Sequence, residues 1–309
     1  MIHNLTKKQL FLLTTWIAIF CNILWGSAFP VLKIVYKEMH ISGNDLAQNI
    51  TFISFRFLLA GIILILLAVF SRKPLFTLTK KQWLLVVTLG VFNTTFQYFF
   101  FNIGVANTHG IKASILGQVG IFFSIVLAHF LTHDDKLTTR KIVGLFLGFF
   151  GLVIINVGSE MNGLFSFSFI GEGFMILSGL FSAISLFIAK KIGKELPSFV
   201  YSGWQMIIGS ILLLLIGISL GGNPLALEFT PKSSILFVYL ALLSSIAFGL
   251  WYGILQYRNI GELSLFKFVI PVSGSILTAI FVPAEHLLPV HLIALILVCV
   301  GIIIVQRNN

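Results

Sequence analysis

The sequence contains few charged residues, and a water-soluble surface cannot be built from them. Only 10% of the 309 residues are charged, whereas 58% are hydrophobic, and the mean hydropathy is +1.03. A soluble domain needs far more surface charge than this, so the composition predicts a protein that is solvated by a lipid bilayer. We therefore expect an integral membrane protein without a separate soluble domain.

Motifs for several kinds of chemistry are also missing. The chain has no His-Glu-x-x-His, no Gly-x-Gly-Asp and no Gly-x-x-x-x-Gly-Lys-Ser/Thr. These absences argue against a membrane enzyme and an ATP-driven pump. Cys21 and Cys299 are too few for a disulfide framework. His129 and His133 have metal-like spacing, but too few further ligands converge there. We predict no enzyme activity, no cofactor and no metal site.

The net charge of +10 does not indicate nucleic-acid binding, because the basic residues form short clusters between apolar runs and do not share one face. Alternating ten spans from a cytoplasmic N-terminus places fifteen Lys and Arg residues on the cytoplasmic side. Only Lys37, Lys112 and Lys232 fall on the other side. This bias predicts a multi-pass protein of the plasma membrane with both termini in the cytoplasm.

Apolar runs of a length suited to the bilayer predict ten transmembrane helices. The first run continues without a charge from Leu10 to Leu32, which favours an uncleaved span over a signal peptide. The predicted spans are Leu10–Tyr36, Ile50–Phe70, Gln82–Gly104, Ile111–Leu131, Ile142–Val157, Gly171–Ala189, Phe199–Leu220, Ser234–Gln256, Ser264–Val282 and Val290–Gln306.

The chain also resembles itself. The segment that begins at Gly144 aligns with the one at Ala294, Asp134 aligns with Glu285, and the segment at Arg56 aligns with that at Gln205. These offsets agree within two residues and predict a duplication, with repeats at 1–158 and 168–309. Because each repeat has an odd number of spans, the second must cross the membrane in the opposite sense. Such inverted repeats are typical of alternating-access carriers.

Several short motifs resemble the EamA-type members of the drug/metabolite transporter superfamily. They are Trp25-Gly-Ser-Ala-Phe-Pro-Val-Leu-Lys33, Arg56-Phe-Leu-Leu-Ala60, Lys112-Ala-Ser-Ile-Leu and Phe266-Lys-Phe-Val-Ile-Pro-Val-Ser-Gly-Ser-Ile-Leu. The resemblance spans essentially the whole chain and implies an all-α fold of two inverted five-helix repeats. It further implies that the third, fourth, eighth and ninth helices form the centre, and that the fifth and tenth are peripheral.

Polar residues inside the predicted spans are the candidates for a substrate site. Arg56 lies well inside its span, where it either faces a cavity or extends to the membrane surface. Lys33, Lys112 and Lys267 lie near span ends, and we expect them to reach the surface. The other candidates line a cavity or form interhelical hydrogen bonds. They are Asn93, Thr94, Gln97, Tyr98, Gln118, Trp204, Ser245, Trp251 and Tyr252.

These observations predict a secondary transporter that exports small metabolites such as amino acids. A small-molecule substrate and the lipid bilayer are then its expected partners. A channel-like facilitator and a membrane receptor for a small molecule are the alternatives. Every acidic residue lies at the end of a predicted span or in a loop, so anionic or zwitterionic solutes fit better than cationic ones. Gly144, Gly148 and Gly151 permit close helix packing, either inside the chain or in a homodimer.

Overall fold

The computed structural model describes residues 6–42, 45–73, 75–108, 113, 115–156, 167–281 and 289–306, and all regular elements within them are helices. Lys112 and Glu285 lie outside these residues. The elements in chain order are α1 (Lys7–Glu38), α2 (Leu46–Phe70), α3 (Lys80–Leu89), η2 (Gly90–Phe96), α4 (Gln97–Ala106), α6 (Val119–Leu131), α7 (Thr139–Asn156), η3 (Phe169–Gly173), α8 (Phe174–Ile192), α9 (Ser198–Ser219), η4 (Pro224–Ala226), α10 (Pro231–Ile254), α11 (Ile260–Leu265), η5 (Phe266–Phe268), α12 (Val269–Phe281) and α13 (Pro289–Gln306).

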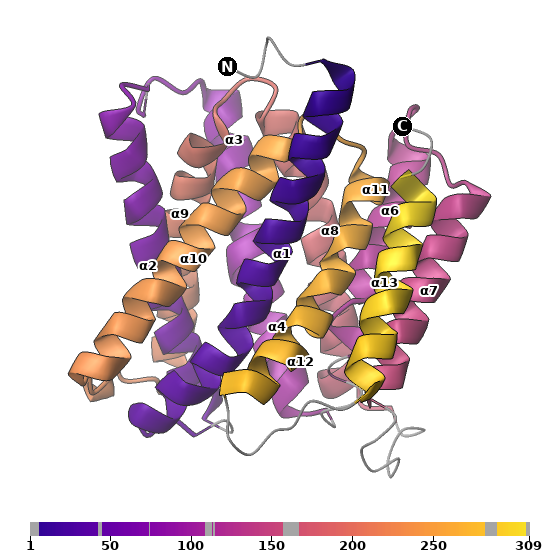
Figure 1. The fold of residues 1–309 in the computed structure, drawn as a ribbon. Helices are drawn as coiled ribbons and strands as arrows, with labels where there is room; N and C mark the ends of the chain where they lie inside the picture. Colours follow the sequence, from indigo (N-terminus) through magenta and orange to yellow (C-terminus); the bar gives the residue numbers. More distant parts are fainter. Residues whose placement is uncertain are drawn as a thin grey trace.

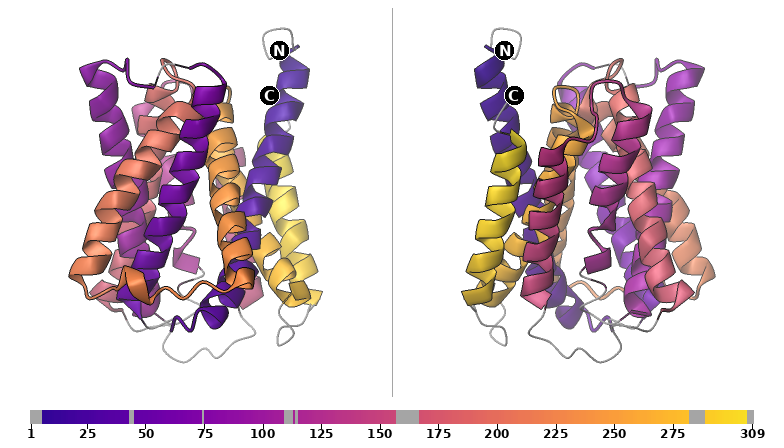
Figure 2. Two further views of the ribbon diagram at one scale, coloured as in Figure 1. Left: turned by 90° about the vertical axis from the view of Figure 1, so that its left-hand side faces the viewer. Right: turned by 90° about the vertical axis from the view of Figure 1, so that its right-hand side faces the viewer.

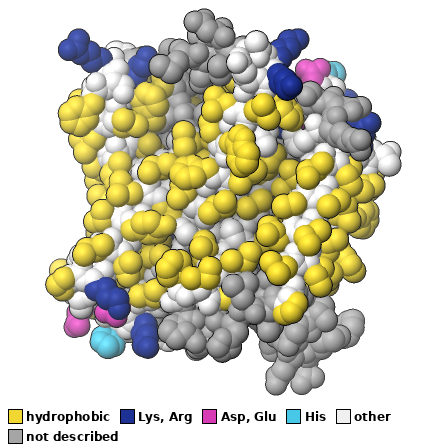
Figure 3. All heavy atoms as spheres, viewed as in Figure 1, with side chains coloured by type: hydrophobic (Ala, Val, Ile, Leu, Met, Phe, Trp, Pro, Cys, Tyr) yellow, Lys and Arg dark blue, Asp and Glu magenta, His cyan; other side chains and the backbone are white. Residues whose placement is uncertain are grey.

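The main helices run roughly along one common direction and form a bundle (Figure 1). Helix α1 begins and α13 ends at the same end of the bundle, which we call the termini end (Figure 1). Apolar side chains cover the middle of the face in Figure 3, and the charged ones gather at the two ends. Because water does not reach the bilayer core, this distribution is that of a protein embedded in lipid.

The predicted all-α membrane fold is confirmed. Among the described residues, seven helices are long and apolar enough to cross a bilayer, and Val119–Leu131 and Leu292–Gln306 are shorter apolar helices. Helices occupy parts of all ten predicted segments within the described residues. Because several of them are short, the number of ten spans stays a prediction.

Three central segments depart from the continuous helices that the sequence predicts. The third span contains the π-helix η2, and a turn at residues 117–118 precedes α6. The ninth span contains the 3-10 turn η5 between α11 and α12. Pro271 explains that turn, because its ring lacks an N–H and crowds the carbonyl of Lys267, four residues earlier.

Pairs of glycines allow the central helices to approach closely. A Cβ atom on Gly120 of α6 would lie 3.0 Å from the carbonyl oxygen of Gly179 in α8. A Cβ atom on Gly26 of α1 would lie 2.9 Å from the backbone nitrogen of Gly274 in α12. Any larger residue must therefore separate the backbones at these crossings.

Helices α7 and α13 pack against each other at one side of the bundle, and α2 and α9 pack together on the opposite side (Figures 1 and 2). The glycine run on α7 faces its own chain: Gly144 contacts the backbone of Gly301 in α13, and Gly148 contacts the ring of Phe268. Internal packing therefore explains this run. The expected peripheral place of the fifth and tenth helices agrees with this arrangement.

Candidate functional site

A cavity of about 230 Å³ lies among the central helices. Its walls come from both halves of the sequence: α1, α2, η2, α4 and α6 from the first half, and α8, α10 and the η5–α12 segment from the second. The volume lies below the range of roughly 300–1,000 Å³ typical of pockets for drug-sized ligands. A small solute therefore fits this cavity better than a bulky one.

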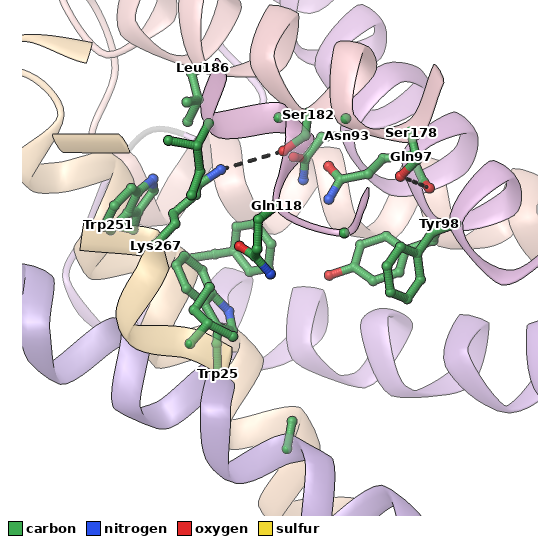
Figure 4. Close-up of a pocket in the computed structure, with 18 of the residues that line it drawn as sticks. Trp25, Asn93, Gln97, Tyr98, Gln118, Ser178, Ser182, Leu186, Trp251 and Lys267 are labelled. Atoms are coloured by element: carbon green, nitrogen blue, oxygen red, sulfur yellow. Dashed lines mark hydrogen bonds between the residues drawn. The ribbon is translucent and has the colours of Figure 1, made fainter. Parts of the chain in front are cut away.

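One wall of the cavity is polar. Asn93 lies on η2, while Gln97 and Tyr98 lie on the first turn of α4, and their polar groups point toward the space next to Gln118 (Figure 4). The π-helix adds a residue to the turn and thereby changes which side chains share this face. Asn93 Nδ2 and Gln97 Oε1 are buried without a hydrogen-bond partner among the described residues. Both atoms therefore keep an unused hydrogen-bonding capacity at the cavity wall.

Another wall is aromatic. The ring of Trp25 on α1 packs edge-on against Phe248 and Trp251 of α10, with centroids 5.2 and 5.4 Å apart. Tyr252 lines the same wall, and its hydroxyl, like Trp251 Nε1, is buried without a partner in the described part of the chain. These rings provide an apolar surface with polar groups at its edge.

Two basic side chains line the cavity. Arg56 of α2 is only 5% exposed, and its Nε donates a hydrogen bond to Ser244 Oγ at 3.2 Å. Lys267 in η5 points into the cavity and donates to Ser182 Oγ at 3.4 Å (Figure 4). Both partners are neutral hydroxyl groups. Arg56 and Lys267 both line the cavity. For Lys267 this differs from our expectation that its ammonium group reaches the membrane surface.

The described acidic residues lie away from the cavity, and none of them lines it. Glu38 pairs with Lys232 at 2.6 Å, and Asp135 pairs with Lys141 at 2.5 Å. Glu195 lies 4.0 Å from Lys81 on an exposed surface. Within the described residues, the cavity is thus positively charged without a neutralising carboxylate.

The structure brings seven of the sequence-predicted residues to the cavity. They are Arg56, Asn93, Gln97, Tyr98, Gln118, Trp251 and Tyr252.

Three further candidates lie elsewhere. Thr94 donates a hydrogen bond to Gln205 Oε1 on α9 at 2.8 Å, and Ser245 donates to the Leu242 carbonyl within α10. Trp204 donates to the Leu75 carbonyl at 3.1 Å and packs on Trp83. These contacts are interhelical or local hydrogen bonds, which was the alternative interpretation of such residues.

Ser178 and Ser182 on α8 were not among the residues predicted from the sequence. Both line the cavity, and Ser178 donates to the Gln97 carbonyl at 2.9 Å. Their spacing of four places them on one face of a helix, together with Gly179 at its crossing with α6. That small and polar face is a sequence signal that could have identified them.

A buried polar cluster closes the bundle at the termini end. Asp135, in the connection before α7, pairs with Lys141 and accepts a hydrogen bond from the Gly261 backbone N–H at 2.7 Å. Arg258, between α10 and α11, bonds to Thr14 of α1 and to Gln306 of α13. Burial lowers the pKa of Arg258, and the nearby carboxylate of Glu262 opposes this shift. The cluster thus joins several helices at one end of the molecule.

Comparisons with known proteins agree with this geometry. The profile of the EamA-like transporter family matches twice, at residues 12–157 and 169–307. Two uncharacterized transporters of Archaeoglobus fulgidus are similar: one is 26% identical over 84% of both chains, the other 28% identical over 95% of this chain and 99% of its own. A WAT1-related chloroplastic protein of Arabidopsis thaliana is 24% identical over 82% of this chain and 60% of its own.

A solved crystal structure shares the fold. It has a TM-score of 0.76 and 16% sequence identity, and the match covers 94% of this chain and 95% of that one.

Proposed function

Because the chain belongs to the EamA-like transporter family, a branch of the drug/metabolite transporter superfamily, we propose that this multi-pass membrane transporter is a secondary carrier. It exports small metabolites such as amino acids by alternating access at the interface of two inverted repeats. The observation that carries this proposal is the central cavity, which has walls from both halves of the chain and buried polar groups without partners among the described residues.

The helix pairing supports the inverted repeats at 1–158 and 168–309. If the halves are equivalent, α1 corresponds to α8, and α6 corresponds to α12. The contact of α1 with α12 then has its counterpart in the contact of α8 with α6, and both exist. Helices α6 and α12 each have 13 residues and start 150 positions apart. The family profile also matches each half separately.

A pair of hydrogen bonds supports the same relation at the level of side chains. Arg56 of α2 bonds to Ser244 of α10, and Thr94 of η2 bonds to Gln205 of α9. Arg56 and Gln205 are 149 positions apart, and Thr94 and Ser244 are 150 apart. Equivalent residues of the two halves thus form equivalent interhelical contacts, in the way expected for duplicated units related by a two-fold axis.

A secondary carrier needs neither chemical conversion of its solute nor ATP. In a carrier, the two repeats rock about the shared cavity, so a solute is accessible from one side at a time. In this proposal, the polar cluster at the termini end forms one gate, and it separates when the repeats rock to open that side. With the positive-inside bias, the termini end faces the cytoplasm of the plasma membrane.

A flux assay with purified protein in liposomes tests this proposal. The liposomes are loaded with one unlabelled solute at a time from a panel of amino acids, nucleobases and drugs. A carrier gives saturable uptake of the labelled solute and accelerated exchange by counterflow. Flux that rises linearly with concentration and shows no counterflow indicates the channel-like alternative. Solute binding without any flux indicates the receptor alternative, and either result overturns the carrier proposal.

A further inference from the structure

We propose that the solute is a small organic acid with two acid groups, held between Arg56 and Lys267 at two depths of the cavity. The inference rests on the proposed transport function and specifies its substrate class. Acidic amino acids and short dicarboxylates meet this description.

The first observation is that two cations face the cavity and bind only neutral groups. The guanidinium carbon of Arg56 lies 4.8 Å from the Phe57 ring, and the Lys267 ammonium lies 6.0 Å from the Trp251 ring. Their hydrogen bonds go to the hydroxyl groups of Ser244 and Ser182. No carboxylate of a described residue pairs with either cation. An ionised group within a membrane needs water or an opposite charge, and an anionic solute provides that charge.

The second observation is that the two cations lie at different depths. Arg56 is ten residues from the start of α2 at Leu46, or about 15 Å along the helix from the end opposite the termini. Lys267 is seven residues from the start of α11 at Ile260, or about 10 Å from the termini end, whereas Arg56 is 14 residues, or about 20 Å, from the end of α2 at Phe70 on that same side. One elongated solute with an acid group at each end therefore matches this placement better than a solute with a single anionic group.

The third observation comes from the duplication. The counterpart of Arg56 in the second half, at an offset of 149, is Gln205, and at the offset of 150 that relates α6 to α12 the counterpart of Lys267 in the first half is Gly117, so both counterparts are neutral. Each half therefore contributes one cation to the cavity, but from different helices. The positive charge of the cavity is thus divided between the depth of Arg56 and the depth of Lys267.

The neutral part of the lining fits the same solute. Asn93 Nδ2 and Trp251 Nε1 are N–H donors without partners in the described structure, and both residues line the cavity. Donors of this kind bind carboxylate oxygens. Gln97 Oε1 is an unpaired acceptor, which also accommodates the ammonium group of an acidic amino acid.

Binding to the detergent-purified full chain tests the inference before any transport is measured. Thermal stabilisation is recorded with succinate, glutarate and aspartate, with alanine as a zwitterion and with putrescine as a dication. We expect the three diacids to stabilise the protein at lower concentrations than alanine, and putrescine to have no effect. If none of the diacids binds, or if alanine or putrescine binds more tightly than all of them, the inference is wrong.

Matched variants locate the charges. Arg56→Gln introduces the residue found at the equivalent place in the other half, and Lys267→Gln removes the second cation. We expect each variant to weaken diacid binding at least tenfold. Lys232→Gln also removes one cation, but this residue is exposed and pairs with Glu38, so affinity should not change. Unchanged affinity in both cavity variants contradicts the inference. If a variant does not fold, the ligand preference of the unaltered protein still decides.

Counterflow with the same solutes separates this inference from the proposed function. Diacid binding without exchange in liposomes supports the inference and overturns the carrier proposal. Saturable exchange of neutral or cationic solutes, with no diacid binding, supports the carrier and overturns the inference.

Discussion

Replacing Asp135 by Asn should destabilise the protein strongly, because it leaves the Lys141 ammonium buried without a counter-charge. The side chains of Lys141 and Asp135 are only 6% and 3% exposed, and their charged atoms lie 2.5 Å apart. Asparagine keeps the shape and an oxygen for the Gly261 N–H. Removing one partner of a buried ion pair costs about 3–5 kcal/mol, so we expect a loss of that size.

The exposed pair of Lys81 and Glu195 provides the control. Their charged atoms are 4.0 Å apart, and the side chains are 68% and 41% exposed. Since water and salt screen such a pair, Glu195→Gln should cost no more than about 1 kcal/mol.

A double-mutant cycle completes the test. Lys141→Met added to Asp135→Asn removes the buried charge and should restore about 2 kcal/mol or more of the lost stability. The measurement is reversible unfolding by a denaturing detergent, followed by tryptophan fluorescence. An Asp135→Asn variant within about 1 kcal/mol of the unaltered protein would refute the reasoning, and so would a double variant no more stable than the single one.

Three further predictions follow from the packing and the cavity. Gly120→Ala should lower the melting temperature, because the new Cβ atom lies 3.0 Å from the Gly179 carbonyl oxygen. Gly249→Ala should not lower it, because its new Cβ atom has one side-chain contact, at 3.4 Å. Thermal denaturation of both variants compares them. Trp251→Phe should raise the transport KM severalfold by removing a cavity N–H group; an unchanged KM in proteoliposomes would exclude Trp251 from the site. Trp204→Phe loses its bond to Leu75, so stability should fall by about 1 kcal/mol without a change in KM.

Hydrophobic pattern was sufficient to predict the helices but not their interruptions. The run from Leu10 to Tyr36 lies inside the observed α1, since a long apolar segment in lipid has to satisfy its backbone hydrogen bonds as a helix. The π-helix η2 has the same apolar and polar composition as a regular helix, and nothing in that composition distinguishes them. Pro271 is a local sequence signal for the turn at η5, because its ring crowds the carbonyl of the residue four positions earlier.

Part of the candidate site could be predicted, because polar residues inside a bilayer either line a cavity or form hydrogen bonds between helices. Gln97 and Tyr98 face the cavity, whereas Thr94, from the same polar stretch, faces α9. Sequence alone could not separate them, because the helix rotation depends on the π-helix and on the crossing with α9. Lys267 was misplaced for a similar reason: its depth is near a span end, but its direction is set by η5, which turns the side chain inward.

The central claim is that one cavity between two inverted repeats serves both sides of the membrane. The direct test introduces Ser182→Cys into a chain that also carries Cys21→Ser and Cys299→Ser. The protein is placed in liposomes, and a membrane-impermeant thiol reagent is added from each side in turn to label the cysteine. We predict that the cysteine reacts from either side and that a bound solute slows both reactions. Reaction from one side only, under all solute conditions, would contradict alternating access.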